Sequence, residues 1–280
     1  MSDRVIVLTG ASDGIGAAAA KSFADAGEHV AVVGRSPEKT AAVAERIGAA
    51  AFVCDFAELA QVRLLAEQLL GRYPRIDVLA NNAGGIFGAE RQITTDGHEQ
   101  TFQINYLAPA LLTRLLLDRL IESEATVINT SSVANRLFGT LDLAGLDDLD
   151  GARSYSPTRA YGDAKLAQIL FTKELARRYG ARGLSAAAFH PGVIASNFSN
   201  ASGAAMRLLY GTGFGRRLLN TPEEGADTLF WLAESQPGLD WTSGGYFVKR
   251  KPARANRRAN DPALASALWD RTSQLLAEHR

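Results

Sequence analysis

Tyr161 and Lys165, four residues apart, are the pair whose types and spacing most directly suggest chemistry. On a helix this spacing places both side chains on one face. Free tyrosine has a pKa of about 10, too high for efficient acid–base work near neutrality, and a neighbouring cation lowers it. Such a phenol could protonate a carbonyl oxygen or deprotonate an alcohol during hydride transfer. The motif also arises often by chance; Tyr155 is a poorer candidate, because Arg159 stands four residues later and Pro157 intervenes.

A second candidate site is the glycine-rich stretch from Thr9 to Gly16, between an apolar run and an alanine-rich helical pattern. Glycine lets the backbone approach a ligand closely, and the following helix N-terminus offers N–H groups to a pyrophosphate. The spacing is G-x-x-x-G-x-G, not the general G-x-G-x-x-G fingerprint, so a tight strand–helix turn is the alternative. The residues expected to contact a dinucleotide here are Gly10, Ser12, Asp13, Gly14, Ile15 and Gly16.

Short apolar runs and helical patterns alternate along the chain, and these elements must position the candidate residues. The predicted strands are residues 5–8, 29–33, 51–54, 76–80, 125–129 and 184–189, and the clearest helices are 14–26, 37–47 and 59–73. Strands that are apolar throughout are expected where helices cover both faces of a parallel sheet. The alternation predicts a doubly wound α/β sheet. No linker or repeat interrupts it, so we expect a single domain over residues 1–280.

The residue that ends the second predicted strand bears on cofactor choice. In a doubly wound sheet it lies beside the adenosine ribose, where an acid prefers NAD and an arginine accommodates a 2′-phosphate. Here Arg35 follows the strand and no acid is present, which favours NADP(H) over NAD(H); a solvated surface charge is the alternative. Asp55 could accept the adenine amino group, or be an ordinary turn or N-cap residue. Further expected cofactor contacts at the same edge of the sheet are Phe56, Asn82, Ala83 and Gly84.

Composition excludes several classes of protein. Hydrophobic residues make up 46% and charged residues 21%, as in a packed globular chain. Thirty basic and 30 acidic residues give a formal net charge of zero, so no global field favours nucleic acid or an anionic membrane. The single cysteine, Cys54, excludes an internal disulfide, and the four histidines are scattered, so no metal site is expected. Without a signal-like or membrane-spanning apolar stretch, we expect a cytoplasmic protein.

Together these motifs resemble the classical short-chain dehydrogenases/reductases, in the same order and over almost the whole chain. The resemblance rests on the glycine loop, the run from Asn81 to Gly84, Asn105, Ser132, Tyr161 with Lys165, and Pro191-Gly192. It implies a Rossmann-type sheet of about seven strands in a three-layer αβα arrangement. It also implies four catalytic residues: Ser132 would hydrogen-bond the substrate oxygen and Tyr161 would be the acid/base. Lys165 would bind the nicotinamide ribose and lower the tyrosine pKa, and Asn105 would hold a water. Pro191, Gly192, Val193 and Ser196 would cover the nicotinamide.

Between Ser132 and Tyr161 the chain carries an insertion, about residues 139–159. This insertion and the ending around Tyr246-Phe247 and Leu268-Trp269 resemble the branch of retinol dehydrogenases and WW-domain oxidoreductases. The resemblance implies a substrate lid at about 196–220 and a C-terminal extension at about 249–280. We expect the basic run of this extension (Lys249, Arg250, Lys251, Arg254, Arg257 and Arg258) to be a solvated stretch before the last helix.

The expected function is NADP(H)-dependent interconversion of a carbonyl and an alcohol on a small molecule. The alternatives are reduction of an enone double bond and a non-catalytic nucleotide sensor, although degenerate sensors typically lose the tyrosine or the lysine. His190 is expected to be a packed, satisfied histidine rather than a proton shuttle. By analogy with the family, a homodimer or homotetramer is expected, and no nucleic acid or membrane partner.

Overall fold

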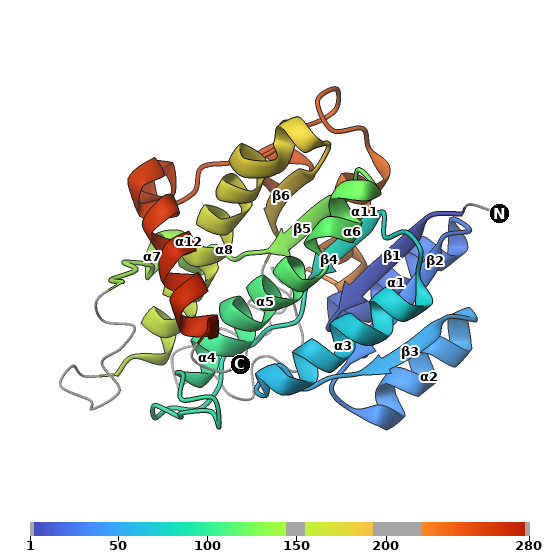
Figure 1. Ribbon diagram of the computed structural model, residues 1–280, viewed down its shortest axis with the longest axis horizontal. Coiled ribbons are helices and arrows are strands. Elements are labelled where there is room, and N and C mark those ends of the chain that lie inside the picture. Colours follow the sequence, from blue (N-terminus) through green and yellow to red (C-terminus); the bar gives the residue numbers. More distant parts are fainter. Residues whose placement is uncertain (1–2, 144–154, 193–219, 278–280) are drawn as a thin grey trace.

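A computed structural model describes residues 3–143, 155–192 and 220–277. Within these residues, eight strands form one sheet in the order β3-β2-β1-β4-β5-β6-β7-β8, with helices on both faces (Figure 1). The strands are β1 Val5–Thr9, β2 His29–Gly34, β3 Ala50–Val53, β4 Val78–Asn81, β5 Thr126–Thr130, β6 Ser185–His190, β7 Gly245–Val248 and β8 Lys251–Pro252. The first seven are parallel, and β8 pairs antiparallel with β7. The predicted doubly wound α/β fold is therefore confirmed, with one short strand more than the expected seven.

The helices divide between the two faces of the sheet. Their bounds are α1 Gly14–Asp25, α2 Pro37–Ile47, α3 Leu59–Arg72, α4 Gln100–Phe102, η1 Gln103–Leu107, α5 Ala108–Leu115, α6 Leu117–Glu122, α7 Ala134–Leu137, α8 Pro157–Tyr179, η3 Gly180–Arg182, α11 Pro222–Glu234, η5 Arg257–Asn260 and α12 Pro262–Ala277. Buried side chains of α3, α5 and α8 form one apolar cluster with the sheet. Those of α1, α2 and α11 form the other, so the arrangement has three layers.

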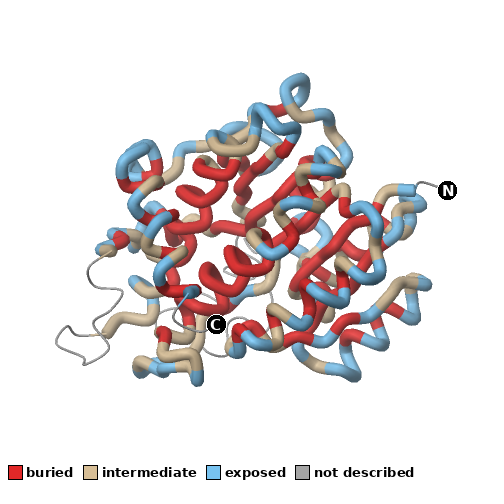
Figure 2. The backbone as a smooth tube through the Cα atoms, viewed as in Figure 1, coloured by how far each residue is buried: buried red, intermediate tan, exposed pale blue. Residues whose placement is uncertain are grey.

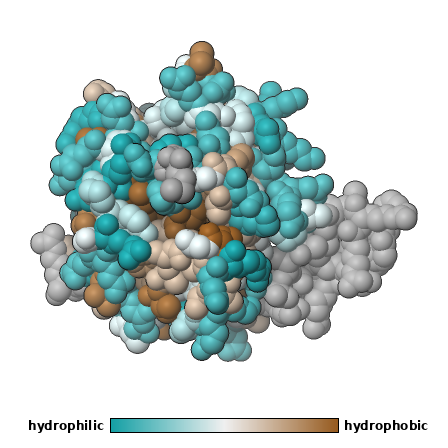
Figure 3. Space-filling view, turned by 90° about the vertical axis from the view of Figure 1, so that its right-hand side faces the viewer, coloured by the Kyte–Doolittle hydropathy of each residue, from teal (hydrophilic) through white to brown (hydrophobic). Residues whose placement is uncertain are grey.

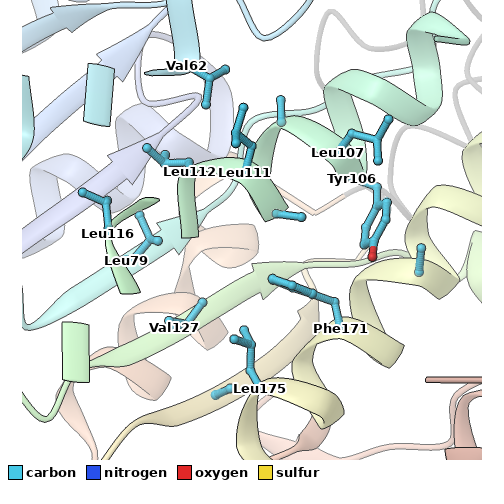
Figure 4. Close-up of a cluster of buried hydrophobic side chains, with 14 of the residues drawn as sticks. Val62, Leu79, Tyr106, Leu107, Leu111, Leu112, Leu116, Val127, Phe171 and Leu175 are labelled. Carbon is cyan, nitrogen blue, oxygen red and sulfur yellow. The ribbon is translucent and has the colours of Figure 1, made fainter. Parts of the chain in front are cut away.

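Successive side chains along a strand belong alternately to the two apolar clusters. Val7 of β1 belongs to the α3/α5/α8 side, whereas its neighbours Ile6 and Leu8 belong to the opposite side, and all three are fully buried. This alternation follows from the two-residue period of a strand. Figure 2 shows the central strands β1, β4 and β5 buried along their whole length, whereas the edge strands β3 and β8 are largely exposed. In Figure 4, Tyr106 from η1 and Phe171 from α8 lie on the same side of the sheet, within the first cluster.

The C-terminal helix α12 packs against α8 (Figure 1). The Trp269 ring stacks on Phe171 with centroids 5.4 Å apart, and the Arg114 guanidinium lies 4.2 Å from the centroid of the same indole. The Tyr106 hydroxyl lies 2.7 Å from Thr272 Oγ1. The extension is therefore built into the helix layer that carries Tyr161.

Figure 3 views the molecule from the side of β3 and α2. Hydrophilic side chains cover most of this face, with a smaller apolar area near its centre. Among the helices of the described ranges, none combines the length and the apolar character needed to cross a bilayer.

Candidate active site

The Lys165 ammonium nitrogen lies 5.3 Å from the centroid of the Tyr161 ring on α8. Both residues are buried, with Tyr161 9% and Lys165 3% exposed. Lys165 Nζ donates a hydrogen bond to the Thr130 carbonyl at the end of β5, at 3.0 Å. Burial lowers the pKa of Lys165 from 10.5 to about 7, because a charged ammonium loses its hydration there. The predicted pair is thus brought together where β5 ends.

Ser132 lies two residues after the end of β5 and is half-buried. The preceding Ser131 donates its hydroxyl to the Lys165 carbonyl at 2.7 Å, which ties this segment to α8. Ser132 Oγ accepts the N–H of Ala134 at 3.3 Å. Because that contact uses a lone pair, the Ser132 O–H can still donate to another oxygen.

Two glycines allow α7 to approach α8 beside Tyr161. A Cβ on Gly162 would lie 2.9 Å from the Ala134 carbonyl oxygen and 2.8 Å from the Gly139 nitrogen. The next residue, Asp163, accepts the N–H groups of Thr140 and Leu141 at 2.5 and 2.6 Å through one oxygen. Sequence reasoning missed Gly162 and Asp163; a glycine inside a helical pattern is the signal that could have indicated close packing.

Asn105 lies wholly buried in η1, a π-helical segment, which is a feature often found at functional sites. Its side-chain amide donates to the carbonyls of Gly85 and Thr101 at 2.7 and 2.8 Å, and its Oδ1 accepts the Gly85 N–H at 3.0 Å. Its own carbonyl accepts the Gln168 amide of α8 at 2.7 Å. Asn105 is therefore held firmly by protein partners, and its expected hold on a water stays a prediction.

Gly84 lies close to the side chains of both Asn105 and Lys165. A Cβ on Gly84 would lie 3.1 Å from Lys165 Nζ and would overlap Asn105 Oδ1. Only glycine therefore lets the segment after β4 pass so close to both side chains.

The glycine loop after β1 has the shape of an anion cradle. Gly10 and Gly14 have φ of +65° and +51°, which glycine adopts without strain. A Cβ on Gly16 would overlap the Gly10 carbonyl, so the loop folds back tightly on the start of α1. Asp13 caps α1 by accepting the Gly14 N–H at 2.8 Å. The first turn of the helix, with Ile15 and Gly16, presents its N–H groups toward the loop, which suits a pyrophosphate.

Thr9 and Asn82 join the glycine loop to the segment that follows β4. No signal in the sequence indicated this role of Thr9. Thr9 Oγ1 accepts the N–H groups of Asn82 and Ala83, each at 3.0 Å. The Asn82 amide donates to the Thr9 carbonyl at 3.1 Å, and its Oδ1 accepts the Thr130 hydroxyl at 3.3 Å. The ends of β1, β4 and β5 are thereby joined. The strand order reverses between β1 and β4, where open α/β sheets bind their ligands.

At the end of β2, Gly34 lies against the glycine loop, because a Cβ there would be 2.8 Å from Ser12 Oγ. Arg35 follows and is exposed. Lys39, one turn into α2, pairs with Asp13 across 2.9 Å, and both side chains are more than half exposed. The predicted 2′-phosphate residue thus stands beside the loop.

Asp55 adopts the ordinary turn role. Its Oδ1 accepts the Ala57 N–H at 2.9 Å, and its own N–H donates to Gln61 Oε1 at 2.9 Å. Phe56 is buried, and its carbonyl accepts the Gln103 amide at 3.3 Å. An adenine contact by Asp55 or Phe56 stays a prediction.

The segment expected over the nicotinamide begins within the described residues and continues outside them. Gly192 has φ +90°, and the Pro191 carbonyl accepts the Asn220 amide at 3.4 Å. Val193, Ser196, nearly all of the expected lid and residues 144–154 of the insertion lie outside the described residues. Within them, His190 Nδ1 is buried without a hydrogen-bond partner, so the expectation of a satisfied histidine is wrong at this atom. Burial lowers the pKa of His190 to about 4.

The basic run is exposed at all six of its charged residues, as expected for a solvated stretch. Two of them also bond to the rest of the protein. Arg250 forms an exposed ion pair with Asp227 of α11. Arg258 reaches the Leu141 carbonyl at 3.4 Å. The end of the run therefore contacts the segment that follows Ser132, because η5 packs there.

Cys54 is buried, and burial raises the pKa of its thiol to about 12, so it behaves as a small apolar side chain. In the described part of the chain, no three His, Cys, Asp or Glu side chains are grouped to hold a metal ion.

Comparison with known proteins places this geometry in a family. A family model described as short chain dehydrogenase matches residues 4–140. The chain is 40% identical over 282 residues to "Putative daunorubicin C-13 ketoreductase DnrU" of Streptomyces sp. (strain C5), covering 98% of this chain and 93% of that protein. It is 35% identical to retinol dehydrogenase 12 of Mus musculus, covering 98% of this chain and 86% of that protein.

A solved structure of an uncharacterized protein from Mycobacterium paratuberculosis superposes with a TM-score of 0.76 at 32% identity, covering 99% of this chain and 94% of that one. Similarity thus extends over nearly the whole length, well beyond the part matched by the family model. The chain therefore belongs to the short-chain dehydrogenase/reductase family of oxidoreductases, in its retinol dehydrogenase-like branch.

Proposed function

We propose that this protein is an NADP(H)-dependent oxidoreductase that interconverts a carbonyl group and an alcohol on a small molecule, with Tyr161 as acid/base. The observation that carries the proposal is the buried Lys165 ammonium beside the Tyr161 ring, at the edge of the sheet where the glycine loop lies. Relatives named as a ketoreductase and as retinol dehydrogenases support chemistry on carbonyl and hydroxyl groups.

The nicotinamide, when bound, supplies hydride to the carbonyl carbon or takes it from the alcohol. Tyr161 gives its phenolic proton to the substrate oxygen in reduction and takes it back in oxidation. The Ser132 hydroxyl donates a hydrogen bond to that oxygen and orients it. The Lys165 ammonium stabilises the phenolate and so lowers the pKa of the phenol, an effect strengthened by burial because little water screens the charges.

For the cofactor, the glycine loop (Gly10, Ser12, Asp13, Gly14, Ile15 and Gly16) would hold the pyrophosphate at the start of α1. The exposed Arg35 guanidinium would hold the 2′-phosphate through its planar fork of donors. Lys165 would also bind the nicotinamide ribose, near Asn82, Ala83 and Gly84. Pro191, Gly192, Val193 and Ser196 would cover the nicotinamide, and Asp55 and Phe56 would lie at the adenine. The cytoplasm is the proposed compartment.

A cofactor-oxidation screen tests the proposal. NADPH and NADH are each offered with panels of aldehydes, ketones, quinones and enones, and cofactor consumption is followed. We expect ketone or aldehyde reduction with NADPH. Clear preference for NADH would contradict the role given to Arg35. Turnover of enones alone would favour the double-bond reductase, and NADPH binding without oxidation would favour a nucleotide sensor.

A further inference from the structure

We propose that Asn256, in the C-terminal extension, is a positioning residue that acts through Asn135 to hold Ser132 in place. The proposal rests on the proposed function, because it matters only if Ser132 orients the substrate oxygen. It makes residues more than 100 positions after Ser132 part of the construction of the active site.

Asn135 is the link to Ser132. It lies three residues later, on α7, and is 1% exposed. Its backbone N–H and its side-chain amide both donate to the Ser132 carbonyl, at 3.0 and 2.5 Å. Its Oδ1 accepts the Asn256 N–H at 2.9 Å, and its amide also lies 3.3 Å from the Tyr246 hydroxyl. One buried side chain therefore joins the Ser132 backbone to β7 and to the extension.

Asn256 completes the link from the other side. Its amide nitrogen donates to the carbonyls of Asn135 and Gly139 at 2.8 and 2.7 Å. Its Oδ1 caps η5 by accepting the Arg258 N–H at 2.9 Å. These partners are backbone groups of fixed polarity, so they determine which end of the amide faces which neighbour. A carboxylate could keep the cap but would face two carbonyl oxygens.

The segment held in this way has two supports. On one side α7 and the residues after it lie against Gly162 and are bonded to Asp163 of α8, next to Tyr161. On the other side Asn256 binds the same segment. Because α7 has a single turn and exposes Leu137 and Phe138, it has little other buried surface to fix it. Loss of the Asn256 support should let Ser132 shift relative to Tyr161.

Such a shift would affect the chemical step more than cofactor binding. Misplacement of a reacting group by about 1 Å can cost about 100-fold in rate. The glycine loop and Arg35 lie on other elements, so NADPH affinity should not change. A purely structural role would lower the stability of the protein and leave kcat of the folded fraction intact.

The variants Asn256→Ala and Asn256→Asp test the proposal. Asn260→Ala is the matched control, because Asn260 ends the short helix that Asn256 caps and its side chain accepts an exposed hydrogen bond from Lys173 rather than binding α7. Each is assayed at a temperature well below its own Tm, with NADPH and the best carbonyl compound from the screen. We measure kcat, KM for both substrates, Kd for NADPH and the pH dependence of kcat.

For both Asn256 variants we expect kcat to fall about tenfold or more, with NADPH Kd unchanged. The alkaline limb of the pH profile should also shift, since the group that hydrogen-bonds the reacting oxygen has moved. Asn260→Ala should match the wild type. Wild-type kcat in both Asn256 variants, or an equal loss in Asn260→Ala, would overturn the proposal.

Two further variants keep the outcome decisive. If these Asn256 variants do not fold, Asn256→Ser keeps an N-cap residue for η5 and removes the two hydrogen bonds that the amide donates to the carbonyls of Asn135 and Gly139; a fall in kcat at unchanged NADPH Kd is expected, and an unchanged kcat would overturn the proposal. Tyr161→Phe distinguishes a failure of this inference from a failure of the proposed function. If it is inactive while the Asn256 variants are fully active, this inference fails alone; if it is fully active, the proposed function fails.

Discussion

The Lys165 ammonium nitrogen lies 5.3 Å from the centre of the Tyr161 ring and 3.0 Å from the Thr130 carbonyl oxygen. The same charge therefore faces the phenol of α8 and the end of β5. Burial lowers the lysine pKa because it disfavours the charged form, and in the protonated form it strengthens the attraction of the ammonium for a phenolate.

Lys165→Met should change how stability depends on pH. The pKa of Lys165 is about 7 in the folded chain against 10.5 for a free lysine. Between these values the unfolded chain binds a proton that the folded chain has released, so this side chain makes the free energy of unfolding rise with pH. The wild type should gain stability relative to the variant from about pH 7 to about pH 10, by at most about 1.4 kcal/mol per pH unit. Urea unfolding at several pH values measures it; a constant difference would contradict the burial of this charge.

Gly162→Ala should lower both stability and kcat. The new methyl group would press on the backbone of Ala134 and Gly139, which costs about 1–3 kcal/mol and moves the segment after Ser132. Gly71→Ala is the control, since no atom lies within 4 Å of its Cβ position on the exposed side of α3. That control should gain about 0.5–1 kcal/mol, as expected for alanine in a helix. Equal behaviour of the two variants would show that α7 and α8 are not in tight contact.

His190→Gln should make the protein more resistant to acid. Burial lowers the pKa of His190 from 6.5 to about 4. Between these two pH values the unfolded chain binds a proton at His190 that the folded chain does not bind. The wild type should therefore lose up to about 3 kcal/mol relative to the variant as the pH falls toward 4. Thermal unfolding from neutral to acidic pH checks this, and parallel curves for the two proteins would rule it out.

Arg35→Ser should weaken NADPH and spare NADH. Loss of a charge-assisted hydrogen bond to the 2′-phosphate costs about 1.5–3 kcal/mol, or about 10- to 100-fold in affinity. Lys39→Ser is the comparison, because that lysine is already paired with Asp13 at an exposed position. We expect a smaller effect there, measured by fluorescence titration with both cofactors. An equal loss of NADH binding in Arg35→Ser would mean that the Arg35 side chain does not bind the 2′-phosphate of NADPH.

Local signals were strong enough to predict most elements. Helix α2 matches its predicted range, 37–47, because Ser36 caps it, Pro37 begins it and Gly48, at φ +66°, ends it. The six predicted strands are found within one or two residues of their expected bounds. Strand β7 had no predicted range, and β8 was not foreseen, since its two residues, Lys251 and Pro252, are not typical of a strand and depend on pairing with β7.

The site was predictable as a set of motifs but not as an arrangement. The sequence indicated Tyr161, Lys165 and the glycine loop, because their chemistry follows from residue type and local spacing. It did not indicate Asn135 and Asn256, which meet only because η5 folds back onto α7. Contacts between residues 121 positions apart leave no local pattern. The π-helical turn around Asn105 was missed for a different reason, because its apolar spacing looks like that of an ordinary helix.

The central claim, that Tyr161 is the acid/base, is tested most directly by single-turnover hydride transfer in Tyr161→Phe. NADPH binding and the far-UV circular dichroism spectrum serve as controls for an intact fold. The account predicts that the rate of NADPH oxidation by a carbonyl substrate falls by about 10²- to 10⁴-fold while NADPH affinity stays the same. A wild-type rate in the folded variant would contradict it.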